Sequence, residues 1–301
     1  MSTADTTTKH TELLDRVRSV LHAQRVRKWS SLVAIQPHGS RVPVFGVHPI
    51  NGEVYFYHRL APLLGPEQPV YALRARGLDG KTEPLSRIED MAAAYLREIA
   101  QVQPHGPYII VGRCNGSRVA FEMAQQLTRA GESLALLCLI DPGPIPVPLS
   151  PAQRVADLAR YVRYHASRGR LGRAVVRSAT PRARRVRARL IALRARVTGA
   201  PVRAARTPVA LRRTKDLLRD VLTSSQYREQ AYAGRVLFFS AADALRHEAS
   251  HHSWGGVADL DVRHVPGDHR TIASPANLSI LAQQLRCCLD DLSAGSRGAD
   301  R

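Results

Sequence analysis

Short apolar runs bounded by turn residues alternate along this chain with longer stretches whose apolar residues recur at helical spacing. Strands and helices differ in length and hydrophobic period, so the short runs are interpreted as buried strands and the longer stretches as helices. The predicted strands cover residues 32–36, 42–49, 69–75, 108–112, 134–141, 235–241 and 261–267. The predicted helices cover residues 11–27, 88–103, 117–130 and 277–292. This alternation predicts an α/β fold, with helices on both faces of a mostly parallel sheet.

Length and composition narrow the class of protein. The 301 residues are 44% apolar, enough for a substantial core, so a wholly disordered chain is excluded. No apolar run reaches the ~18 residues of a transmembrane helix, and the N-terminus lacks the apolar run of a signal peptide. The four cysteines show no CxxC spacing, and we expect neither a disulfide framework nor a zinc ribbon. A cytoplasmic protein without a membrane span is expected.

The net charge of +19 suggests a nucleic-acid binder until its distribution is considered. Residues 151–220 contain 19 Arg and one Lys against three Asp, a local net charge of +17. The rest of the chain carries 24 basic and 22 acidic residues. The excess therefore belongs to one segment, whose helical patches interrupt the alternation of strands and helices.

The sequence Gly112-Arg113-Cys114-Asn115-Gly116 stands between a predicted strand and a predicted helix. This is the pattern of a nucleophile elbow, in which glycines permit a sharp turn that exposes the central side chain. The amides and dipole of the helix N-terminus favour the thiolate of a cysteine placed there. The alternative is a small buried cysteine in a glycine-containing turn.

A nucleophile of this kind needs a base and an acid that orients the base. His269 follows the last predicted strand and is the candidate base. Asp141 ends the strand after the elbow helix, and Asp243 follows the next strand, so two acids compete. Asp141 also fits a plain turn in Asp-Pro-Gly, and spacing alone leaves these alternatives open.

Residues 31–145 and 230–292 resemble the thioesterase domains that end nonribosomal peptide and polyketide synthases. The resemblance rests on the opening IQPHGSRVPVFGVHPINGEVYFYHRLAPLLGPEQPVYALRARGLDG, on IEDMAAAYLREIAQVQPHGPYIIVGRCNGSRVAFEMAQQLTRAGE and on the histidine loop VPGDHRTI. It implies the α/β-hydrolase fold. The family commonly has GWSFGG at the elbow, where this chain has GRCNGS.

The resemblance also implies roles for individual residues. It makes Cys114 the nucleophile, His269 the general base and Asp141 the acid. The oxyanion hole would use the backbone amides of Asn115 and Ile50. The core would comprise residues 31–150 and 225–293, after an N-terminal helical extension at 1–30. A helical, Arg-rich lid would occupy 151–224, and a disordered tail 294–301.

The implied function is acyl transfer from the phosphopantetheine thioester of a carrier protein through an acyl-cysteine. Hydrolysis or cyclisation would release a polyketide or nonribosomal peptide-type chain, as in antibiotic biosynthesis. An acyl-cysteine is itself a thioester, so transfer between carrier proteins or onto an amine is the alternative. No cofactor is expected. The basic lid suits an acidic carrier protein, although a merely solvated Arg-rich face fits equally well.

Other classes of function remain as rivals. Residues 247–251 spell HExxH, which binds zinc when it lies on a helix with a third ligand. The resemblance instead assigns this stretch to a connection between strands, so no metal is expected. The Arg-rich segment could contact phosphates, but it has only two aromatic residues and no recognised nucleic-acid motif. An inactive interaction module would require an unassembled triad.

Overall fold

The computed structural model describes residues 30–145, 227–242 and 246–299, together with Asp216, Leu218 and Leu222. The predicted N-terminal helix, almost all of the predicted lid and Asp243 lie outside the described residues. The strands are β1 (Leu32–Gln36), β2 (Val44–Val47), β3 (Val70–Leu73), β4 (Tyr108–Arg113), β5 (Leu134–Ile140), β6 (Tyr232–Ala241) and β7 (Ala258–Val265). The helices are α2 (Tyr55–Leu64), α3 (Ile88–Ile99), α4 (Gly116–Arg129), α9 (Arg246–Gly255) and α10 (Pro275–Ala299), with a short 3-10 turn η1 (Thr271–Ala273).

All seven strands join one sheet in the order β1-β3-β2-β4-β5-β6-β7. Only β1 runs antiparallel, against β3, and the other neighbours are parallel. The carboxyl ends of β2 to β7 therefore meet at one edge of the sheet, where ligand sites of parallel α/β folds are found. The α/β fold with a mostly parallel sheet is as predicted.

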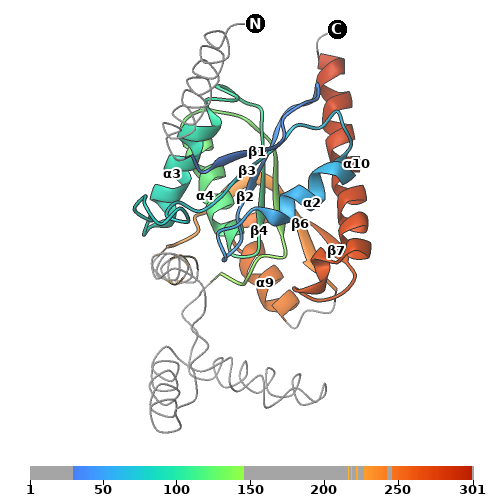
Figure 1. The fold of residues 1–301 in the computed structure, drawn as a ribbon. Coiled ribbons are helices and arrows are strands. Elements are labelled where there is room, and N and C mark those ends of the chain that lie inside the picture. The colour runs from blue at the N-terminus through green and yellow to red at the C-terminus, as the bar shows by residue number, and fades with distance from the viewer. Residues whose placement is uncertain are drawn as a thin grey trace, which may run out of the picture.

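Helices cover both faces of the sheet (Figure 1). On one face, α3, α4 and α9 bury side chains such as Met91, Phe121 and Trp254 against inward-facing residues of β2, β4 and β6. On the other face, α2 and α10 bury Tyr57 and Leu281 in a second apolar cluster. Because the central strands are covered on both sides, they are continuous apolar runs without polar alternation.

The helices depart from the predictions in three places. No helix is predicted from the sequence at 55–64, and 247–251 is interpreted there as a connection, but the structure forms α2 and α9. The last helix also continues to residue 299, where a disordered tail is predicted from 294. The packed part of α10 nucleates the helix, and each further residue then adds one backbone hydrogen bond. This favours continuation of α10 to residue 299.

Candidate active site

Cys114 lies in the turn between β4 and α4, in the left-handed region of backbone conformation with φ of 55°. Its N–H donates to the Ile140 carbonyl oxygen at 2.9 Å, and its own carbonyl accepts from the Ser117 N–H at 3.1 Å. A non-glycine residue in this conformation is strained, and such strain concentrates at functional sites. The residue therefore has the backbone geometry of a nucleophile elbow.

Both elbow glycines are needed because there is no room for a side chain. A Cβ at position 112 would lie 2.6 Å from the Ser117 Cα atom. A Cβ at position 116 would lie 2.0 Å from the carbonyl oxygen of His48. The first turn of α4 thus presses directly against the loop after β2, which contains Ile50.

The acid and the base meet at the same sheet edge. Asp141 directly follows β5, is buried, and has a left-handed φ of 44°. Its Oδ1 accepts a hydrogen bond of 3.2 Å from the Ala241 N–H, and its Oδ2 is hydrogen-bonded to Nδ1 of His269. A carboxylate only accepts, so Nδ1 carries a proton and Nε2 remains for another partner.

Cys114 interacts electrostatically with His269, and the interaction changes the pKa of both groups. The hydrogen bond to Asp141, followed by that to Cys114, raises the pKa of His269 to about 9 against the opposing effect of burial. Burial alone would raise the pKa of the Cys114 thiol. The His269 hydrogen bond and charge, the Asn115 backbone amide and the Arg113 charge together lower that pKa. The three side chains favour a thiolate beside an imidazolium.

Helix α9 braces the segment that follows Asp141. Ser250 Oγ donates to the Pro142 carbonyl at 2.6 Å, and Trp254 Nε1 donates to the Gly143 carbonyl at 3.0 Å. Ser253 Oγ accepts from the Ile145 N–H at 3.1 Å. Trp254 is fully buried, so these contacts join the acid-bearing loop to the core.

The loop after β2 is fixed by a buried, uncharged histidine. His48 Nδ1 lies 2.9 Å from the Pro49 carbonyl oxygen, and Nε2 lies 2.8 Å from the Tyr95 hydroxyl. Burial lowers the pKa of His48 to about 4, against the opposing effect of the Pro49 hydrogen bond. The neutral ring donates to Pro49 and accepts from Tyr95, which fixes the tautomer. The start of the loop that contains Ile50 is thereby held against the elbow.

Two residues of the segment between β5 and β6 contact the site. Leu222 offers its carbonyl oxygen to the side chains of Asn115 and Arg118 at 3.2 and 3.1 Å. Leu218 packs beside the loop after β2, since its Cδ2 would lie 3.2 Å from a Cβ on Gly52.

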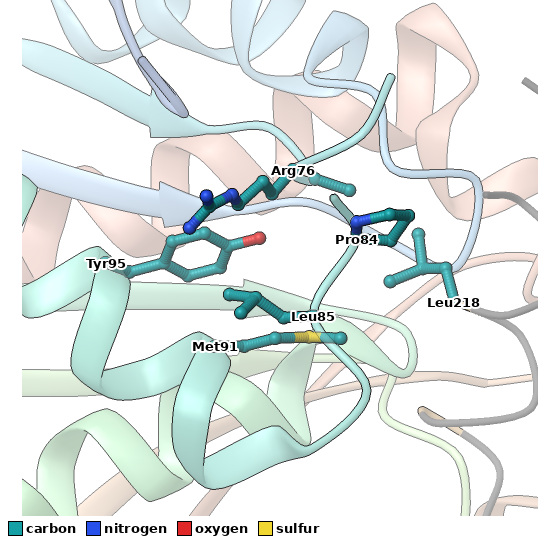
Figure 2. Close-up of a pocket in the computed structure, with 7 residues that line it drawn as sticks. Arg76, Pro84, Leu85, Met91, Tyr95 and Leu218 are labelled. Atoms are coloured by element: carbon teal, nitrogen blue, oxygen red, sulfur yellow. The ribbon is translucent and has the colours of Figure 1, made fainter. Parts of the chain in front are cut away.

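Figure 2 shows a pocket beside this loop, with Leu218 at one end. The pocket is lined by Ala75, Arg76, Pro84, Leu85, Met91, Tyr95 and Leu218. The lining is mainly apolar, with one guanidinium group. Tyr95 lines this pocket and is also hydrogen-bonded to His48, so the pocket lies next to the start of the loop after β2.

The structure brings Cys114, Asp141 and His269 together and places Asn115 and Ile50 on the two segments that adjoin at the elbow. Among the described residues, Asp141 is the acid that contacts His269, and Asp243 lies outside them. No role is predicted from the sequence for His48, Tyr95 or the Asn115 side chain. The sequence signal is limited to their positions, since Asn115 lies inside the Gly112–Gly116 motif and His48 directly precedes Pro49.

The alternative metal site receives no support from the described side chains. The ring of His251 packs edge-on against Phe238, 6.3 Å between ring centroids. Within the described ranges, no group of three or more His, Cys, Asp or Glu residues is arranged to hold a metal ion. The side chains of His247 and Glu248 lie outside the description, so the absence of a metal stays a prediction. All four cysteines are free thiols.

The fold and the site geometry define an α/β-hydrolase. A family model for the thioesterase domain matches residues 42–287, and the chain belongs to this family. Part of the chain is 46% identical over 105 residues to the nonribosomal peptide synthetase btyA of Aspergillus terreus, covering 35% of this chain and 11% of the synthetase. It is also 36% identical over 131 residues to a dimodular nonribosomal peptide synthase of Bacillus subtilis, covering 42% and 6%. The chain thus matches a small part of much longer relatives.

Solved structures agree with this assignment. The thioesterase domain of NocB, in covalent complex with a fluorophosphonate nocardicin G analogue, is 26% identical with a TM-score of 0.59. That comparison covers 86% of this chain and 99% of the NocB domain. A four-domain nonribosomal peptide synthetase bound to AMP and glycine shares the fold, with a TM-score of 0.63, 22% identity, and coverage of 90% and 21%. Among the described helices, none has the length and apolar character needed to cross a membrane.

Proposed function

We propose that this protein releases or transfers an acyl chain from the phosphopantetheine thioester of a carrier protein, through an acyl-cysteine on Cys114. The observation that supports the proposal is the strained elbow conformation of Cys114 together with the hydrogen bond between His269 and Asp141, since His269 lowers the pKa of the thiol. The relatives are nonribosomal peptide synthetases, which supports a nonribosomal peptide-type acyl chain as substrate, and a polyketide-type chain stays a prediction.

The loading step follows from the positions of these groups. The Cys114 thiolate attacks the thioester carbonyl, and the new carbon–sulfur bond forms as the carbonyl oxygen takes the negative charge. The backbone amides of Asn115 and Ile50 are the proposed donors to that oxygen. When the tetrahedral intermediate collapses, the bond to the pantetheine sulfur breaks. The leaving thiolate takes the proton from His269, and Asp141 keeps the imidazole correctly oriented.

The release step reverses these roles. His269 takes a proton from the acceptor, the acceptor attacks the acyl-cysteine carbonyl, and Cys114 leaves as a thiolate. With water as acceptor the product is a free acid, and with an internal nucleophile it is a ring. The side chain of His269 is 46% exposed, which leaves it open to an incoming acceptor.

A second candidate is transfer to an amine or to another carrier thiol, and the observation that favours it is the cysteine itself. An acyl-serine is an oxygen ester, so loading it from a thioester is downhill and forming a new thioester from it is uphill. An acyl-cysteine is a thioester, which keeps the acyl group activated and makes loading reversible.

Intact-protein mass spectrometry after incubation with an acyl-loaded carrier protein tests both candidates. We expect the acyl mass on the wild type and on Cys287→Ala, which removes an exposed cysteine as a control, but not on Cys114→Ala. Rapid loss of the mass in buffer alone indicates hydrolysis. Accumulation followed by discharge on adding an amine or a second carrier indicates transfer. An acylated Cys114→Ala variant would contradict the proposal.

A further inference from the structure

The side chain of Asn115 lies between the reactive sulfur and the carbonyl of Leu222. Its Oδ1 is 3.3 Å from Cys114 Sγ, and its Nδ2 is 3.2 Å from the Leu222 carbonyl oxygen. A carbonyl oxygen can only accept, so the amide nitrogen must face Leu222 and the amide oxygen must face the sulfur. The backbone of residue 222 therefore sets the orientation of this carboxamide.

The Leu222 carbonyl is itself held in place by a buried ion pair. Arg118 donates to it through Nη1 at 3.1 Å and to the Tyr227 carbonyl through Nη2 at 3.2 Å. The same guanidinium pairs through Nε with Glu229 at 2.5 Å, and the two side chains are only 3% and 1% exposed. The Leu222 carbonyl is therefore held between Asn115 and a guanidinium that is itself anchored by a buried carboxylate.

An amide oxygen aimed at the sulfur distinguishes between its two protonation states. The neutral thiol donates its S–H to Asn115 Oδ1, whereas the thiolate has no proton to donate and is repelled by the partial negative charge. The Asn115 side chain therefore stabilises the neutral thiol, although its backbone amide stabilises the thiolate.

Other charged groups act on the same sulfur from the neighbouring elements. His269 faces it from the loop after β7, with Asp141 behind the imidazole at the end of β5. Arg113 acts from the end of β4, where its guanidinium lies 4.6 Å from the centre of the Phe56 ring. On the α4 side, the charge of Arg118 is matched by Glu229. Asn115 is the neighbour whose side-chain contact opposes the thiolate.

We propose that Asn115 is a positioning residue whose carboxamide, oriented by the Leu222 carbonyl, accepts a hydrogen bond from the Cys114 thiol and so opposes the thiolate that His269 favours. When the thiolate forms, the S–H bond breaks, the proton forms an N–H bond at Nε2 of His269, and the hydrogen bond from sulfur to Asn115 Oδ1 is lost. The inference rests on the proposed function only in taking Cys114 as the reactive group. The protonation state of Cys114 thereby depends on the position of the Leu222 backbone carbonyl.

The test is the pH dependence of Cys114 alkylation by iodoacetamide, which requires no carrier protein or acyl substrate. The modified peptide is quantified by mass spectrometry, so that Cys287 does not interfere. The variants are Asn115→Leu, which keeps the approximate shape, and Asn115→Ala, which fits if leucine does not. Gln126→Leu removes another amide of α4, one that bonds Glu89 and Glu122, and serves as control.

We expect the alkylation midpoint to fall by about 0.5 to 1 pH unit in both Asn115 variants, the equivalent of one lost hydrogen bond. The midpoint of Gln126→Leu should equal that of the wild type. An unchanged or higher midpoint in a folded Asn115 variant overturns the inference. A failure of carrier-dependent acylation with a lowered midpoint would instead sink the proposed function and leave this inference intact.

Discussion

The carbonyl oxygen of His48 occupies the space that a side chain on Gly116 would need, since a Cβ there would lie 2.0 Å from that oxygen. Contact between two backbones cannot be relieved by rotating a side chain. Gly116→Ala must therefore push α4 away from the loop after β2. We expect a loss of about 1–3 kcal/mol in the free energy of unfolding, typical of overpacking, together with a marked loss of acylation.

Gly131→Ala is the matched control for Gly116→Ala. Gly131 has a φ of 77°, but a Cβ there would meet nothing within 4 Å, so alanine carries only the backbone cost of roughly 1–2 kcal/mol. Urea denaturation and acylation rates separate the two cases. Full acylation by a folded Gly116→Ala variant would show that the close approach at the elbow is unimportant for chemistry.

Asp141→Asn tests the acid. An asparagine cannot hold the His269 Nδ1 proton as a carboxylate does, so the pKa of His269 falls and the thiolate loses its charged neighbour. We expect alkylation of Cys114 at pH 7 to slow by at least about tenfold, which corresponds to one unit in the thiol pKa. Asp243→Asn, the other acid that spacing allows, should alkylate at the wild-type rate. The reverse result would reassign the acid to Asp243.

His48 makes stability depend on pH. Its folded-state pKa of about 4 lies below the ordinary 6.5, so the unfolded chain binds a proton that the folded protein refuses. Stability is unaffected above pH 6.5 and declines as the pH falls from 6.5 towards 4. By pH 5 the loss is roughly 2 kcal/mol.

His48→Gln removes this proton linkage and should flatten that part of the stability profile, even if the variant is less stable at every pH. Urea denaturation at pH 7.5 and pH 5 measures the difference. His105→Gln, at a side chain that is 84% exposed, is the control and should keep the wild-type slope. An equally steep profile in His48→Gln would show that another group is responsible.

The Arg-rich segment gives a prediction about the carrier. Arg182, Arg184, Arg185 and Arg187 lie outside the described residues, but they belong to the region that carries the excess charge. If that charge attracts an acidic carrier, changing these four to Glu should slow loading from the carrier by about tenfold or more at low salt. Loading from a small free thioester should barely change.

Arg97→Glu combined with Arg286→Glu, on the exposed surfaces of α3 and α10, controls for a general change in net charge. Loading rates measured at two ionic strengths complete the comparison. Equal effects on the carrier and the small thioester, or none on either, would favour an Arg-rich segment that is simply solvated.

The strands and the elbow were predictable because their signals are local. An apolar run such as that of β4 followed by Gly-x-Cys-x-Gly needs no tertiary information. Helix α2 was missed because Pro62 lies inside it and its aromatic start has strand-like character. Helix α9 was missed because most of its residues are polar. Its position depends on Trp254, which packs against Phe121 far away in the sequence.

The buried polar contacts could not be predicted, because each joins distant segments. Arg118 and Glu229 are 111 residues apart, and in the sequence either one is indistinguishable from a solvated surface charge. His48 and Tyr95 are likewise far apart in the sequence, separated by 47 residues. The choice of Asp141 over Asp243 came from the family resemblance, since spacing alone left both acids open.

The order of elements along the chain sets when the cysteine becomes reactive during synthesis. Cys114 and Asp141 are made early, but His269 comes 128 residues after Asp141. Before β6 exists, residues Leu137 to Ile140 of β5 have an unpaired edge, which Val236 to Phe239 later occupy. A ribosome-bound chain thus carries an elbow whose thiol has no imidazole beside it. The loop with His269 follows β7, so the thiol acquires its imidazole neighbour only after the last strand has joined the sheet.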